Sequence, residues 1–174
     1  MKQSTLKSVD TLIEHFPELE ECRKDLTRAV EILCESYRQG HKLLVCGNGG
    51  SASDSEHVVG ELMKGFIKKR PISQELYSKM QCICPEHADY LKNNLQGALP
   101  AIALVNETAL TTAFANDQAP DLSFAQQVLG LGQQVDVLMG ISTSGNSANV
   151  IYAVEMAKVL GLPTIALTGK AAAS

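Results

Sequence analysis

The stretch VCGNGGSASDSEHVVGELMKGF, Val45 to Phe66, decides the fold, because a short apolar run passes through a glycine turn into a helical pattern. The run that leads into the turn, KLLVCG (42–47), has no polar alternation, which is typical of a strand buried on both faces. After the turn, Val58, Val59 and Leu62 recur at helical spacing. The sequence therefore predicts a strand that feeds directly into a helix.

Three further apolar runs have the same character: PAIALV (100–105), VDVLMGIS (135–142) and LPTIAL (162–167). Helical pattern separates each run from the next. Strand–helix–strand order predicts an α/β fold with a parallel sheet between layers of helices. The length of 174 residues suits a single domain, 1–174.

Two amphipathic helices are predicted before the first strand. The first ends at Pro17, and the second continues to Tyr37 with Gly40 as its C-terminal cap. Helices in this position are expected to pack on the body of the domain or on another subunit.

The composition excludes several classes of protein. Apolar residues make up 45% of the chain, and no segment approaches the ~18 apolar residues of a membrane span. The first residues have no apolar signal-peptide core, and five scattered cysteines fit reduced thiols in the cytoplasm. A net charge of −4 without a basic block argues against binding to nucleic acid.

The segment 67–97 is longer than a crossover between strands needs. Ser73 is predicted to cap one short helix and Pro85 to begin another. Cys82, Cys84 and His87 suggest a zinc site. Only three candidate ligands are present and the spacing is CxC, so the sequence favours residues without a metal. We expect a helical excursion near the mouth of the functional site.

The glycine turn is a candidate anion site. Free backbone N–H groups and the helix dipole favour an anion where a parallel strand ends and a helix begins. Gly49 and Gly50 permit close approach of the backbone, and Asn48 and Ser51 offer side-chain hydrogen bonds. The turn matches neither GxGxxG nor a Walker loop, so it leaves a purely structural turn open.

A second turn, STSGNS (142–147), is more specific. It supplies four hydroxyls, and a helix start needs one side chain for capping. The four hydroxyls belong to Ser142, Thr143, Ser144 and Ser147. The cluster predicts a phosphate monoester held by hydroxyls and backbone amides.

His57 and Glu61 stand four residues apart on the predicted helix, so they share one face. A solvated pair is the plain interpretation. In this position the pair could also supply two metal ligands, or a general base beside its orienting partner.

The motifs CGNGGSASDSEHVVGEL, FANDQ and GISTSGNSANVIYA make the chain similar to the SIS (sugar isomerase) domain family, and especially to its isomerases of heptose phosphates. The resemblance covers nearly the whole chain. It implies a five-stranded parallel sheet flanked by helices and a homotetramer with active sites at subunit boundaries. It also implies aldose–ketose isomerisation of a sugar phosphate, with the replication-initiator-binding or sugar-phosphate-sensing relatives as the non-catalytic alternative.

The resemblance also implies roles for residues. Asn48, Gly49 and Gly50 match the substrate-binding turn, and residues 142–147 match the phosphate loop. His57 and Glu61 match zinc-binding positions, and Glu61 also matches the acid/base carboxylate. The remaining match is the substrate-contacting pair Asn116 and Asp117.

Two departures accompany the resemblance. The segment 67–97 is longer than in the best-known members, and the Gln and His of a C-terminal helix have no counterpart before Ser174. We therefore expect the natural chain to continue past Ser174 through a further strand and helix.

Overall fold

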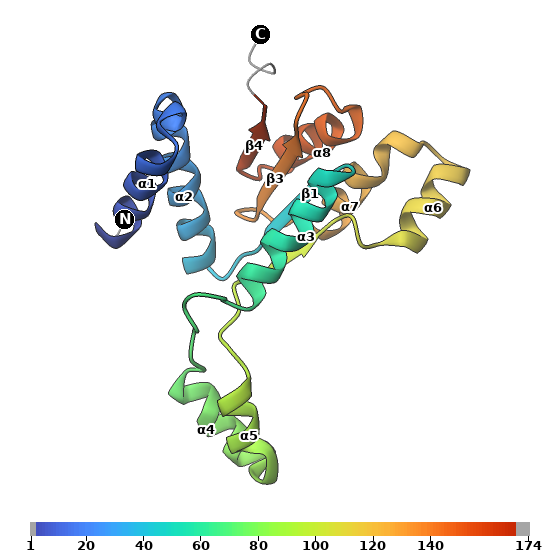
Figure 1. The fold of residues 1–174 in the computed structure, drawn as a ribbon. Coiled ribbons are helices and arrows are strands. Elements are labelled where there is room, and N and C mark those ends of the chain that lie inside the picture. The colour runs from blue at the N-terminus through green and yellow to red at the C-terminus, as the bar shows by residue number, and fades with distance from the viewer. Residues whose placement is uncertain (1–2, 170–174) are drawn as a thin grey trace.

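The computed structural model describes residues 3–169, with side chains from residue 7 onward, as an α/β fold on one parallel sheet (Figure 1). The described strands are β1 (Leu43–Gly47), β2 (Ala101–Ala103), β3 (Val137–Ser142) and β4 (Thr164–Thr168). Each predicted apolar run thus forms a strand. The expectation of five strands is wrong for residues 3–169, because this part of the sequence offers four such runs and each forms one strand.

The strand order is β2-β1-β3-β4, and all neighbouring strands are parallel. Leu44 of β1 pairs with Ile102 on one side and with Leu138 on the other. Leu44 and Leu138 are fully buried, which contributes about 2 kcal/mol each. Because the strands are parallel, their carboxyl ends lie along one edge of the sheet.

Helices cover both faces of the sheet. On one face, α2 (Arg23–Arg38) and α3 (Gly50–Met63) pack residues such as Leu33 and Val58 against Val45 and Val137. On the other face lie α7 (Ser123–Leu131) and α8 (Ala148–Val159). Burial on two faces explains the lack of polar alternation in the central strands.

The predicted N-terminal helices are confirmed. Helix α1 (Gln3–His15) ends before Pro17, and a 3-10 helix, η1 (Pro17–Cys22), leads into α2. Gly40 has a φ of +80°, and His41 N–H donates to Ser36 O at 3.1 Å, which closes α2.

The long segment forms a helical hairpin of α4 (Gln74–Ile83) and α5 (Pro85–Asn94). Leu76 N–H donates to Ser73 Oγ at 3.2 Å, so the predicted cap is confirmed. The hairpin projects from the far end of α3 (Figure 1, bottom). It lies away from the carboxyl edge of the sheet, because α3 runs away from that edge, and its expected place near the mouth of the functional site stays a prediction.

After β2 the chain forms α6 (Thr108–Asp117), a 3-10 helix, η2 (Pro120–Leu122), and α7. Helix α6 extends away from the sheet in Figure 1. Among the described residues, the helices are all too short or too polar to cross a membrane. The chain end at 171–174, on which one expectation above depends, lies outside the described residues.

Candidate active site

The glycine turn (48–51) and the serine loop (142–147) follow two neighbouring strands, β1 and β3. The chain leaves β1 for β2 on one side of the sheet, and β3 lies on the other side. Ligands of open α/β sheets bind outside the carboxyl ends of strands at such a switch point. The topology therefore brings the two predicted anion turns side by side.

A pair of amides joins the two turns directly. Asn48 Nδ2 donates to Asn149 Oδ1 at 2.8 Å, and Asn149 Nδ2 donates back to Asn48 Oδ1 at 2.8 Å. Asn149 lies in the first turn of α8, immediately beyond the serine loop. The sequence analysis missed Asn149, because no local pattern indicates a partner 101 residues away.

The glycine turn needs its glycines. Gly49 has φ +56° and ψ −118°, a conformation that side chains disfavour. A Cβ on Gly47 would lie 2.7 Å from Ser51 O, so the strand and α3 meet too closely for any other residue. No side chain caps the start of α3 at Gly49, which leaves its first turn suited to an anion.

The serine loop holds its hydroxyls in a tight turn. Ser142 is buried, and its Oγ lies 3.0 Å from Ser147 Oγ. Ser144 Oγ accepts a hydrogen bond from Asn146 N–H at 3.3 Å, and Thr143 and Ser144 are exposed. Ser147 begins α8, but its side chain makes no capping hydrogen bond. The hydroxyls therefore exceed the needs of the helix, as predicted.

The end of β4 also contacts the serine loop. Gly169 N–H donates to Thr143 O at 3.1 Å, and a Cβ on Gly169 would lie 2.6 Å from that oxygen. The loop is thus held between the residue that follows β4 and the start of α8.

His57 and Glu61 lie on the exposed face of α3, while Val58, Val59 and Leu62 face the core. Their spacing of four residues places them in one row that begins at the glycine turn. Eleven residues separate Gly50 from Glu61, which at 1.5 Å per residue corresponds to about 16 Å along the helix. Glu61 therefore lies near the opposite end of α3 from the two turns.

His57 and Glu61 offer only part of the ligand set that zinc needs. His57 and Glu61 give one nitrogen and one carboxylate, whereas zinc sites use three or four protein ligands. Within residues 3–169, no three His, Cys, Asp or Glu side chains gather into a group that could hold a metal ion. The described part of one chain does not complete the expected zinc site.

Asn116 and Asp117 end α6, and Asn116 Nδ2 donates to Asp117 Oδ1 at 2.8 Å. Asp117 lines a cavity of about 450 Å³ with Phe114 and Gln126, between α6 and α7. Within one chain, the fold does not bring this pair to the serine loop, since α6 extends away from the sheet (Figure 1).

Comparison with known proteins places the chain in a family. The model of the SIS domain matches residues 6–96 and 95–169. The chain belongs to the SIS domain family. Phosphoheptose isomerase of Shewanella sp. (strain ANA-3) is 38% identical over 170 residues, 98% of this chain and 72% of that protein. That of Thiobacillus denitrificans is 37% identical over 169 residues, 92% of this chain and 73% of that protein.

Solved structures agree with this SIS domain assignment. Phosphoheptose isomerase of Neisseria gonorrhoeae superposes with a TM-score of 0.66 at 33% identity, covering 98% of this chain and 72% of that one. The phosphoheptose isomerase of Francisella tularensis gives a TM-score of 0.65 at 30% identity, covering 95% of this chain and 78% of that one.

Proposed function

We propose that this SIS protein is a sugar-phosphate isomerase that interconverts sedoheptulose 7-phosphate and a heptose 7-phosphate. The observation that carries the proposal is the meeting of the glycine turn and the serine loop at the switch point, joined by Asn48 and Asn149. The relatives named phosphoheptose isomerase support the same reaction.

The serine loop is proposed to bind the phosphate through Ser142, Thr143, Ser144 and Ser147. The glycine turn is proposed to contact the sugar through Asn48, Gly49, Gly50 and Ser51. Because the phosphate is far from the reacting carbons, these contacts contribute orientation.

Glu61 is proposed to act as the base. Its carboxylate takes a proton from the carbon beside the carbonyl, and the C–H electron pair forms the double bond of an enediol(ate). The carbonyl electron pair moves onto its oxygen, which takes up a proton, while the hydroxyl oxygen on the first carbon gives one up and becomes the new carbonyl. The proton held by Glu61 then returns to the former carbonyl carbon, which converts ketose to aldose with no net redox change. An exposed carboxylate on a helix suits this role, since the substrate can reach it.

The position of Glu61 favours a site shared between subunits. An extended seven-carbon sugar phosphate, with carbon–carbon bonds of about 1.5 Å, spans roughly 10 Å. Glu61 lies about 16 Å along α3 from the glycine turn, so one substrate does not readily reach both within a chain. We therefore propose a homo-oligomer, a tetramer, in which Glu61 and the pair Asn116–Asp117 act with loops of another copy.

Zinc stays a prediction. His57 and Glu61 would supply two of its ligands, and the others would come from water or from groups outside the described residues. When bound, zinc would polarise the oxygens of the substrate as a Lewis acid.

The rival proposal is a non-catalytic SIS protein that binds sugar phosphates. The family resemblance implies that such proteins tend to lose the helix carboxylate and alter the serine loop, and this chain keeps both. Location in the cytoplasm is also proposed, and the five free cysteines support it.

The deciding experiment is an isomerase assay on the purified protein with sedoheptulose 7-phosphate. Glu61→Gln keeps the shape of the side chain and should lower kcat by about 10²–10⁴-fold while substrate binding is retained. Glu56→Gln, an exposed acid on the same helix, is the matched control and should keep full activity. Substrate binding without turnover in the wild-type protein would favour the rival.

A further inference from the structure

The side chain of Arg70 is bound at the junction between α3 and the hairpin. Two chain segments, here named the neck (residues 64–72 and 95–100), connect the hairpin to the body. Arg70 Nε donates to Gly97 O at 2.7 Å, across the neck. Its terminal nitrogen Nη2 donates to Leu62 O at 2.5 Å and to Glu61 O at 3.4 Å.

Two of these acceptors, Leu62 O and Glu61 O, belong to the last turn of α3, and Leu62 O also accepts from Leu99 N–H of the neck at 3.0 Å. The last four carbonyls of an α-helix have no intrahelical N–H, and a cation there also interacts favourably with the helix dipole. Lys64 N–H makes the last backbone bond of α3, to Gly60 O at 2.9 Å. Arg70 therefore closes the turn of α3 that carries Glu61.

The neck is built around this side chain. Arg70 O accepts from Gly97 N–H at 2.7 Å, and Arg70 N–H donates to Gln96 Oε1 at 3.4 Å. Gly65 is buried, and a Cβ there would lie 2.3 Å from Lys68 O and 3.1 Å from Arg70 Nη1. Only glycine leaves the turn free to wrap around the guanidinium.

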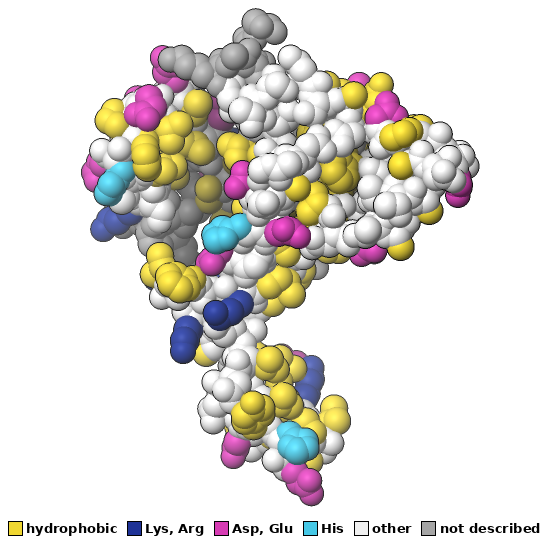
Figure 2. Space-filling model, turned by 45° about the vertical axis from the view of Figure 1, so that its right-hand side comes forward, with side chains coloured by type: hydrophobic (Ala, Val, Ile, Leu, Met, Phe, Trp, Pro, Cys, Tyr) yellow, Lys and Arg dark blue, Asp and Glu magenta, His cyan; other side chains and the backbone are white. Residues whose placement is uncertain are grey.

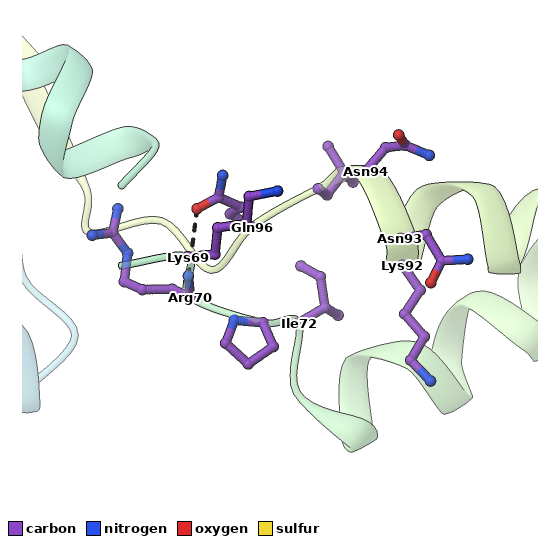
Figure 3. Close-up of a pocket in the computed structure, with 9 residues that line it drawn as sticks. Lys69, Arg70, Ile72, Lys92, Asn93, Asn94 and Gln96 are labelled. Atoms are coloured by element: carbon purple, nitrogen blue, oxygen red, sulfur yellow. Dashed lines mark hydrogen bonds between the residues drawn. The ribbon is translucent and has the colours of Figure 1, made fainter. Parts of the chain in front are cut away.

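A cavity of about 420 Å³ lies beside the neck, lined by Ile72 and Lys92 among others. Figure 3 shows the guanidinium of Arg70 pointing away from the hairpin, toward the end of α3. The guanidinium of Arg70 thus donates its hydrogen bonds to backbone carbonyls. Within residues 3–169 the structure shows no acidic side chain paired with it.

We infer that Arg70 is a positioning residue for Glu61: it holds the last turn of α3 in the orientation that the carboxylate needs. This inference rests on the proposed function. A planar guanidinium can reach two segments at once, so lysine would replace it only in part.

The test compares Arg70→Gln with wild type. We expect kcat to fall roughly 10- to 100-fold, because a small misplacement of a catalytic group is costly. The dissociation constant for inorganic phosphate, measured by calorimetry, should stay within about twofold, because the serine loop is untouched. Arg70→Lys should recover part of kcat, and Lys69→Gln, an exposed cation one residue away, should match wild type.

Rates are expressed per phosphate-binding site, so that loss of folded protein does not count as loss of turnover. A purely stabilising role would lower the melting temperature and leave kcat per site unchanged, which would overturn the inference. Hydrogen exchange gives a readout without activity: the amide of Lys64 should exchange faster in Arg70→Gln, while those of β1 stay protected. Unchanged exchange at Lys64 would also overturn it. An inactive wild-type protein would contradict the proposed function instead. Hydrogen exchange at Lys64 would then test by itself whether Arg70 holds the last turn of α3.

Discussion

At the scale of single residues, the molecule places hydroxyls and amides where two parallel strands end. Ser144 is exposed, and its Oγ accepts a local hydrogen bond from Asn146 N–H. Asn149, by contrast, holds the two turns together through Asn48. We therefore expect the replacement of Ser144 and of Asn149 to act on phosphate binding in different ways.

Replacing Ser144 with Ala should weaken the binding of inorganic phosphate by about 1–3 kcal/mol, because one partner of a bound oxygen is lost. Calorimetry on the variant measures the change. Ser78→Ala, an exposed serine on α4, serves as the control. Equal affinity in Ser144→Ala and wild type would contradict the assignment of the loop.

Replacing Asn149 with Ala should weaken phosphate binding by about 1 kcal/mol, because two hydrogen bonds between the turns are lost. A double-mutant cycle with Asn48→Ala measures the coupling between the two side chains. We expect the double variant to lose less phosphate affinity than the sum of the two single losses. Strict additivity would show that the pair does not act as a unit.

At the scale of elements, the amino edge of the sheet depends on one buried carboxylate. Asp136 is 1% exposed, and its oxygens accept from Lys42 Nζ at 2.5 Å, Lys42 N–H at 3.0 Å and Gln133 N–H at 2.8 Å. His41 Nδ1 lies 3.3 Å away. These contacts tie β1 to β3 just before both strands begin.

Burial by itself would raise the pKa of Asp136, but the hydrogen bonds from Lys42 and Gln133 and the charge of Lys42 outweigh it and lower that pKa. The carboxylate therefore stabilises the fold above its unfolded pKa of 3.8, and the contribution is lost as the pH falls through the lower folded value.

Asp136→Asn should reduce the free energy of unfolding at neutral pH by about 3 kcal/mol, because Lys42 loses its partner. Urea unfolding at several pH values measures this free energy. The difference in free energy of unfolding between the variant and wild type should become smaller below the unfolded pKa. Glu75→Gln, which breaks an exposed pair with Lys79, should change stability little. If that difference in free energy stayed constant with pH, the Asp136 carboxylate would be ruled out as its cause.

At the scale of the whole molecule, several large apolar side chains lie on the surface. Phe16, Phe66, Ile67, Ile83 and Tyr90 are more than half exposed. Figure 2 shows hydrophobic side chains over the N-terminal helices and over the projecting hairpin. Such surfaces mark contacts between proteins, which supports the proposed oligomer.

Co-expression of two inactive variants tests the shared site. Glu61→Gln removes the base, and Ser144→Asp places a negative charge in the phosphate loop. If each site combines Glu61 and Ser144 from different chains, an equal mixture should recover roughly a quarter of wild-type activity, by random assembly of a symmetric oligomer. Recovery should vanish if both residues act within one chain. Light scattering on the same samples reports the oligomeric state.

Much of this could be predicted from local patterns. Four apolar runs became four strands, Pro17 and Gly40 ended helices, and Ser73 capped α4. The His57–Glu61 spacing placed both side chains on one exposed face of α3. Periodicity, capping and turn chemistry act over a few residues, so the sequence displays them directly.

Which segments lie side by side depends on the pairing of the strands. The order β2-β1-β3-β4 brought the two turns together, and it paired Asn48 with Asn149, 101 residues apart. In the folded chain the hairpin also lies at the far end of α3, and Arg70 donates to the carbonyls of Leu62 and Gly97. These features depend on strand pairing and packing between distant segments, and no spacing within a single element records them. Local residue order thus sets the chemistry that each turn offers, and the fold sets which turns lie together.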